Sequence, residues 1–242
     1  LTLDDVVNVA RHGYNVRLDE SAKKEIVKSR EYVDMLVDEG RVVYGITTGF
    51  GKFSDVRISK DEARDLQRNL IISHACGVGN HLPTDIVRAI MLLRANALSK
   101  GFSGIRLETL ETLIGMINAG VIPAIPEKGS LGASGDLAPL SHMVLVLMGE
   151  GDAYYKDELM DGGKAMEMAG LKPIELTSKE GLALINGTQV MTAIGALTVY
   201  ASINLSKLAD VSAALTVEAL NGITDAFHPG LHEVRPHQGQ MD

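Results

Sequence analysis

Three consecutive residues, Ala133, Ser134 and Gly135, could build a reactive group from their own backbone. The Gly135 amide nitrogen can attack the Ala133 carbonyl only through a tight bend, which glycine adopts at low steric cost. Loss of water would close a five-membered ring, and loss of a second water from Ser134 would leave an exocyclic methylene. The product, a 4-methylidene-imidazol-5-one, would be an electrophile that no ordinary side chain supplies.

A Gly/Ser loop ahead of a helix is the ordinary interpretation of such a composition. Three other segments favour the chemical interpretation, namely residues 43–51, 69–79 and 180–189. Together with residues 129–140 they resemble, in the same order, four motifs of the aromatic amino acid ammonia-lyases and aminomutases. The resemblance covers nearly the whole chain and implies a mainly α fold of the aspartase/ammonia-lyase type, with a few short strands and Gly-rich active-site loops.

The resemblance implies catalytic roles for Tyr44 and for the ring formed from Ala133, Ser134 and Gly135. Tyr44 would remove the β-proton of the substrate, and the ring would be the electrophile, so that no external cofactor and no metal is expected. A tyrosine has an ordinary pKa near ~10, so it needs a positive or hydrogen-bonding environment to act near neutral pH. Without the other motifs, a tyrosine that anchors the end of a strand would be the favoured interpretation of Tyr44.

Four residues are expected to bind the substrate. The pair Ser73–His74 is similar to that of the histidine-using members of the family, and it would give a substrate imidazole a polar partner. An apolar ring would leave that partner unsatisfied. Asn186 and Gln189 would bind the amino-acid end of the substrate or the carbonyl of the ring. A hydrogen-bonded core histidine and an ordinary Asn-Gly turn are the competing interpretations.

These roles imply the elimination of ammonia from L-histidine to give trans-urocanate, the first step of histidine degradation, by a homotetramer. A phenylalanine or tyrosine lyase, or an aromatic 2,3-aminomutase, is the alternative within the family. Members of the family are considerably longer than 242 residues, so these residues alone could instead be a non-catalytic folding or assembly domain.

The composition favours a small-molecule substrate. The chain has 31 acidic and 23 basic residues, a net charge of -8, which argues against nucleic acid or an anionic membrane as a partner. Its single cysteine, Cys76, excludes an internal disulfide and fits a reducing compartment. We expect no leader peptide and no apolar run long enough to span a bilayer, hence a cytoplasmic location.

Hydrophobic periodicity and turn residues predict the elements that position these groups. Helices are expected over residues 21–39, 59–75, 84–100, 105–119, 137–148 and 178–221, the last interrupted at Asn186. A short β-like run is expected at 41–44, and a small hairpin near 153–155 within an otherwise irregular 150–175. The tail 227–242 is expected to be irregular. Residues 1–187 would form an N-terminal active-site domain, and residues 188–242 would begin a long-helix region.

Other apparent signals are weaker. Glycines 129, 132 and 135 lack the spacing of a phosphate-binding loop. His228, His232 and His237 have a ligand-like spacing but lack cysteine or acidic partners, so we expect no metal there. Cys76 is expected to be a small buried residue, and Ser134 with His142 lacks the sequence context of a hydrolase.

Overall fold

A computed structural model describes residues 1–43, 45–48, 60–132 and 135–241. The chain divides into two compact units, Leu1–Leu197 and Thr198–Asp242. The domain division expected between residues 187 and 188 stays a prediction.

The first unit is mainly helical, as expected. Its helices are α1 (Leu3–His12), α2 (Glu20–Asp38), α3 (Lys60–His74), α4 (Thr84–Leu98), α5 (Leu107–Ala119), α6 (Leu137–Leu147), α7 (Gly162–Met168), α8 (Glu180–Ile185) and the first turns of α9 (Gln189–Ala219). The predicted break at Asn186 is confirmed, because α8 ends there and α9 starts three residues later. Local caps fix several ends: Thr2 and Asp5 form a capping box on α1, and Gly120, at φ 75°, ends α5.

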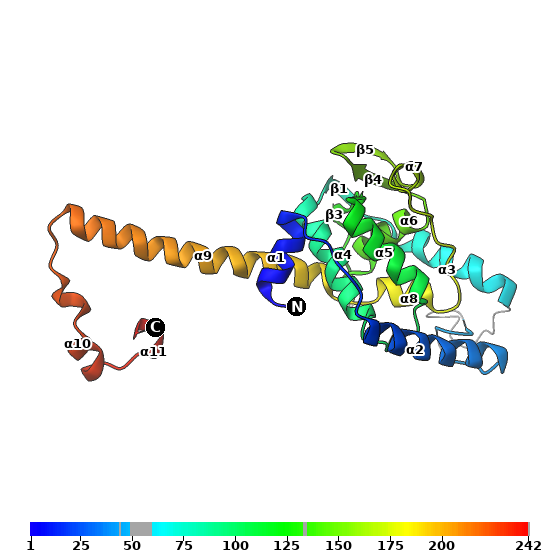
Figure 1. The fold of residues 1–242 in the computed structure, drawn as a ribbon, viewed down its shortest axis with the longest axis horizontal. Helices are drawn as coiled ribbons and strands as arrows, with labels where there is room; N and C mark the ends of the chain where they lie inside the picture. The colour runs from blue at the N-terminus through cyan, green and yellow to red at the C-terminus, as the bar shows by residue number, and fades with distance from the viewer. Residues whose placement is uncertain (44, 49–59, 133–134, 242) are drawn as a thin grey trace. The chain divides into compact units, whose positions relative to one another are not determined.

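The core of this unit lies between α4, α5 and α6. Figure 1 shows α4 and α5 running side by side, and α1 packs against α4. These helices carry apolar residues at the spacings that turn them toward one another. Their completely or almost completely buried members include Ile90, Met91, Leu98, Leu110, Leu113, Met116, Ile117, Leu140, Met143 and Val144.

Among the described residues, two small antiparallel sheets also belong to this unit. In one, β1 (Val78–His81) pairs with β3 (Pro126–Lys128), with Val78 opposite Lys128 and His81 opposite Pro126. In the other, β4 (Asp152–Tyr155) lies between β2 (Ile122–Pro123) and β5 (Glu158–Asp161). The predicted hairpin is therefore confirmed. Lys156 and Asp157 both have positive φ, 52° and 65°, as a two-residue hairpin turn requires.

Two expectations for local structure are wrong. Residues 41–43 form no strand, and Thr47 instead accepts the Val43 N–H at 2.9 Å within a turn. The segment 150–175 contains α7, because the Asp161 side chain caps the Lys164 N–H at 3.0 Å. The pairing of β1 with β3 was not expected.

The second unit contains the rest of α9, a 3₁₀ turn (Thr224–Phe227), α10 (Pro229–Val234) and α11 (Gln238–Met241). The irregular tail is thus also a wrong expectation. His228 caps α10 by accepting the Gly230 N–H at 3.1 Å, and Pro229 occupies the first helical position, where its missing N–H costs nothing.

By length and composition alone, one helical stretch is apolar enough to span a bilayer, so the expectation that none would be is wrong. Helical residues Glu180–Ala219 contain a window of mean hydropathy 1.5, of which 33% is buried. Large apolar side chains stay exposed along α9: Met191, Ile194, Val199, Ile203, Leu205, Leu208, Val211 and Leu215. The charged residues Lys207 and Asp210 lie among them.

Candidate active site

The pairing of β1 with β3 joins two of the four motifs. Strand β1 begins shortly after His74, and β3 ends at Lys128, immediately before the loop that contains Gly135. The two backbones meet at Gly77 and Gly129, where a Cβ added to Gly129 would come 2.9 Å from the Gly77 Cα. The segment that follows Ser73–His74 therefore forms a wall of the loop.

The described ends of this loop are held in conformations that favour glycine. Gly129, Gly132 and Gly135 have φ of 136°, 102° and 76°. The Ser130 hydroxyl donates a hydrogen bond across the loop to the Gly135 carbonyl. This bond links the two described flanks, and residues 133 and 134 between them lie outside the described residues.

Asp136 anchors the loop to α9. Its buried carboxylate accepts the backbone N–H groups of Val190 and Met191 at 2.8 and 3.2 Å. These N–H groups belong to the first turn of α9, where no partner exists within the helix and the helix dipole favours a negative charge. The loop and the start of α9 are thus fixed to each other.

A cavity of about 390 Å³ lies where these elements converge. Gly77 and Gly135 face it from two motifs, and Met191 and Ile194 face it from α9. Its remaining lining residues are Leu82, Pro126, Glu127, Lys128, Ser130, Asp136, Pro139 and Val190. A mainly apolar pocket with a few polar groups is the usual form of a small-molecule site.

Ser73 and His74 lie at the C-terminal end of α3. The His74 Nδ1 is 2.8 Å from the Leu70 carbonyl oxygen, and the Ser73 hydroxyl donates to the same oxygen at 3.0 Å. Because a carbonyl oxygen can only accept, Nδ1 carries the hydrogen in this contact. A neutral His74 then has its acceptor lone pair on Nε2.

Asn186 and Gln189 lie in the turn between α8 and α9. Asn186 is the C-cap of α8 and its side chain is exposed. The Gln189 Oε1 accepts a hydrogen bond of 2.6 Å from Nη1 of Arg94, a buried residue of α4. The role of Gln189 in substrate binding stays a prediction, with its amide NH₂ as the group still available to donate.

A histidine supports the wall of the loop. The Gly77 N–H donates to Nε2 of His142 in α6 at 3.0 Å, which requires an unprotonated Nε2. Burial lowers the pKa of His142, and the nearby His81 lowers it further. His142 is therefore a neutral acceptor that fixes the backbone at Gly77, and sequence reasoning assigned it no such role.

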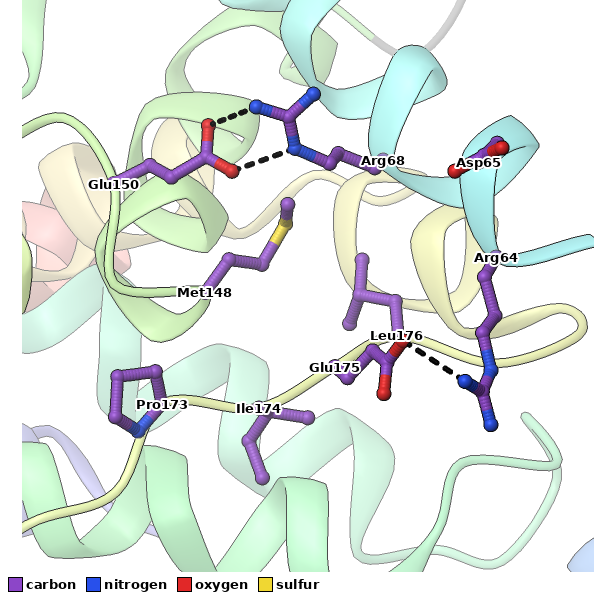
Figure 2. A pocket seen from close by; sticks show the side chains of 9 residues that line it. All are labelled: Arg64, Asp65, Arg68, Met148, Glu150, Pro173, Ile174, Glu175 and Leu176. Carbon is purple, nitrogen blue, oxygen red and sulfur yellow. Dashed lines mark hydrogen bonds and ion pairs between the residues drawn. The ribbon is translucent and has the colours of Figure 1, made fainter.

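A second cavity, of about 310 Å³, lies between α3, the end of α6 and residues 173–176 (Figure 2). Its arginines are already paired: Arg68 binds Glu150 in a bidentate contact of 2.7 and 3.2 Å, and Arg64 binds Glu175 at 3.1 Å. Of the predicted site residues that the structure describes, none lines this cavity, so the cavity lined by Gly77 and Gly135 is the better candidate site.

The structure describes some of the predicted residues and not others. Tyr44, Ala133 and Ser134 lie outside the described residues. Cys76 is exposed, so its prediction as a small buried residue is wrong.

In the described ranges, no group of three or more His, Cys, Asp and Glu residues could hold a metal ion. Arg94 was overlooked, although a charge within the apolar run of α4 was a visible signal.

The chain is similar to known proteins over its whole length. A family model described as aromatic amino acid lyase matches residues 1–242. Over 241 residues the chain is 69% identical to histidine ammonia-lyase of Alkaliphilus oremlandii (strain OhILAs), covering 100% of this chain and 48% of that protein. It is 64% identical to histidine ammonia-lyase of Caldanaerobacter subterraneus subsp. tengcongensis, covering 100% and 47%. The chain spans about half the length of the curated relatives it matches.

Solved structures of family members are also similar to this chain. Histidine ammonia-lyase from Trypanosoma cruzi superposes with a TM-score of 0.92 at 40% identity, over 99% of this chain and 46% of that one. Pantoea agglomerans phenylalanine aminomutase also superposes with a TM-score of 0.92, at 38% identity, over 99% and 46%. The fold is thus shared by proteins named for different substrates and reactions.

Proposed function

We propose, from the premise that this chain belongs to the aromatic amino acid lyase family, that it supplies active-site segments of a histidine ammonia-lyase. The reaction would eliminate ammonia from L-histidine and give trans-urocanate, the first step of histidine degradation. One observation carries the proposal. The segment that follows Ser73–His74 packs through Gly77 against Gly129, at the base of the loop that could form the electrophile.

The electrophile is proposed to be the 4-methylidene-imidazol-5-one formed from Ala133, Ser134 and Gly135, without an external cofactor. When formed, it would supply an acceptor for electrons of the substrate. The described flanks fit this assignment, because Gly135 is half-buried at φ 76° and its carbonyl is held by Ser130. Asp136 holds the C-terminal flank on α9 through the Val190 N–H.

His74 is proposed to select the substrate. With Nδ1 held by the Leu70 carbonyl, neutral His74 offers Nε2 as an acceptor for the N–H of a substrate imidazole. A phenyl ring has no such donor, so it would leave Nε2 without a partner after desolvation. The relatives at 64% and 69% identity are named for histidine, which favours this substrate over phenylalanine or tyrosine.

The remaining assignments concern proton transfer and orientation. Tyr44 is proposed as the base that takes the β-proton. Asn186 and Gln189 are proposed to bind the amino-acid end of the substrate, with the Gln189 NH₂ donating, since its Oε1 accepts from Arg94. A donor at this point suits a substrate carboxylate.

The test is urocanate formation from L-histidine by the complete protein that contains this chain. We expect His74→Leu to lower kcat/KM for histidine by about 10²-fold or more, because a site that hydrogen-bonds its substrate discriminates strongly. His12→Leu is the matched control, since His12 is likewise the last residue of a helix and lies far along the chain from the motifs. No urocanate from a folded wild-type preparation, or unchanged turnover in His74→Leu, would refute the proposal.

For the 242 residues alone we propose a folding and assembly role without catalysis. The exposed apolar residues of α9 favour association with further copies, as in the expected homotetramer, rather than an isolated existence. The interspersed Lys207 and Asp210 favour a protein partner over lipid for this helix, and the single cysteine supports a cytoplasmic location. Robust urocanate release by the purified 242-residue chain would refute this role.

A further inference from the structure

Arg94 is a buried cation next to the proposed site. It lies in α4 between apolar neighbours and is 4% exposed. Its Nη1 donates to the Gln189 Oε1 at 2.6 Å, and its Nη2 donates to the Asn186 carbonyl oxygen at 3.2 Å and to the Ala183 carbonyl oxygen. The Arg94 side chain thus links Ala183 and Asn186, at the end of α8, to Gln189, at the start of α9.

The partners of Arg94 are carbonyl oxygens instead of a carboxylate. In the part of the chain that the structure describes, no Asp or Glu forms an ion pair with it, and its buried Nε has no hydrogen-bond partner. Burial lowers the pKa of Arg94 to about 10, so it stays charged at neutral pH. The Ala183 and Asn186 carbonyls are at the C-terminal end of α8, where a helix dipole favours a cation.

Gly187 shows how closely the turn is fitted to this side chain. A Cβ at Gly187 would overlap both Arg94 Nη1 and Gln189 Oε1. A side chain at residue 187 would therefore displace the Arg94 guanidinium, the Gln189 amide or both. Because Arg94 can only donate, it also fixes which end of the Gln189 amide faces it.

We propose that Arg94 is a positioning residue that holds the Asn186–Gln189 turn in its working geometry and orients the Gln189 amide with its NH₂ free to donate. It contacts the turn and not the substrate, so it acts through these two residues. A planar guanidinium suits this task because its several N–H groups lie in a fixed fork, which a lysine cannot reproduce. The effect on turnover rests on the proposed function, whereas the effect on the turn does not.

The first experiment measures amide hydrogen exchange in the 242-residue chain over peptides that cover residues 183–191. In Arg94→Met we expect exchange there on the order of tenfold faster, because buried hydrogen bonds that hold the turn are lost. Arg88→Met is the matched control. Arg88 lies in the same helix and also donates to backbone carbonyls, those of Val9 at 2.9 Å and Ile117 at 3.2 Å, but it does not touch the turn.

Two results would overturn the proposal: unchanged exchange over 183–191 in Arg94→Met, or equal acceleration there in Arg88→Met, which would indicate a general loss of stability. If Arg94→Met fails to fold, Arg94→Lys takes its place and is judged against Arg88→Lys by the same criteria. In Gly187→Ala the added methyl group would displace Arg94 and Gln189. We expect faster hydrogen exchange in the same peptides, 183–191.

The second experiment measures kinetics in the complete, active protein. Arg94→Met should lower kcat for histidine about 10- to 100-fold, since a misplacement near 1 Å can cost that much, while Arg88→Met should change kcat less than about twofold. Equal kcat in the two variants would contradict the positioning role. If the wild-type protein forms no urocanate, the proposed function fails by itself, and hydrogen exchange still decides the role of Arg94.

Discussion

Gly129 packs on Gly77 backbone to backbone, with no room for a Cβ on Gly129 and little room for one on Gly77. A Cβ on Gly129 would lie 2.9 Å from the Gly77 Cα, and a Cβ on Gly77 would lie 3.0 Å from the His142 Nε2. The base of the loop, the segment after His74 and helix α6 are therefore in one continuous contact. We therefore expect a substitution at either glycine to alter formation of the proposed electrophile.

Gly129→Ala should disturb the loop more than a glycine replacement elsewhere. The new Cβ would overlap the Gly77 backbone, and φ 136° is a conformation that costs a non-glycine residue about 1–3 kcal/mol. We expect a smaller fraction of chains to become lighter by two waters, as measured by intact mass in the preparation where the wild type shows this loss.

Gly120→Ala is the control for Gly129→Ala. Gly120 also has positive φ, 75°, but a Cβ there would meet no atom within 4 Å. It should lower the free energy of unfolding by about 1–2 kcal/mol and leave the fraction of chains that are lighter by two waters as in the wild type. Equal mass spectra for the two variants would speak against a tight fit at Gly129.

Among the acidic residues whose burial the structure describes, Glu180 is expected to be the most costly to replace. It is completely buried and accepts hydrogen bonds from Arg106 Nε at 2.9 Å, the Thr109 hydroxyl at 2.7 Å and the Thr177 N–H at 2.9 Å. Burial acts to raise its pKa, but Arg106 and the other donors outweigh burial, and the pKa is lowered overall. Glu180→Leu should reduce the free energy of unfolding by about 3–5 kcal/mol in urea titrations.

The control for Glu180→Leu is Glu175→Ala. Its ion pair with Arg64 is exposed, with side chains 69% and 61% accessible, and should contribute no more than about 1 kcal/mol. Because the Glu180 pKa is lowered by folding, its contribution is complete above the unfolded value of 4.5 and is lost as pH falls through the lower folded value. A Glu180→Leu variant as stable as Glu175→Ala would contradict this assignment.

His142 should make the first unit less stable in acid. Folding lowers its pKa below the ordinary 6.5, so the unfolded chain binds a proton that the folded chain does not. The free energy of unfolding should therefore fall as pH decreases from about 6.5 toward the lower folded value. His142→Gln keeps an acceptor for the Gly77 N–H but cannot titrate, so its thermal midpoint should vary less over this range. The same pH slope in both proteins would exclude His142 as its source.

The exposed apolar stripe of α9 should control assembly. Leu208, Val211 and Leu215 are spaced by three and four residues, so they share one face, and Leu208 and Leu215 are each 62% exposed. Leu208→Glu should weaken self-association about 10- to 100-fold in sedimentation experiments, since burial of a leucine contributes about 1.5–3 kcal/mol. Ser206→Glu, on the opposite face, should have little effect. Equal association in both variants would argue against this stripe as the contact.

The sequence alone determined the local chemistry and most of the helices. Cyclisation of Ala133, Ser134 and Gly135 requires only adjacent residues, so the sequence could suggest it directly. The periodic apolar residues of the long helices predict those helices, and the turn residues predict the hairpin. In contrast, β1 and β3 are too short and polar to give an alternating pattern, and α7 and α10 depend on single capping side chains.

Only the tertiary structure decided which segments meet. The contact of Gly77 with Gly129, the capping of α9 by Asp136 and the reach of Arg94 to the Asn186 turn all join residues far apart in the chain. Such contacts follow from how α3, α4, α6, α8 and α9 pack, and packing depends on the shapes of many side chains at once, which no local pattern encodes. The sequence thus named the reactive groups, while the packing of the helices determined what supports them.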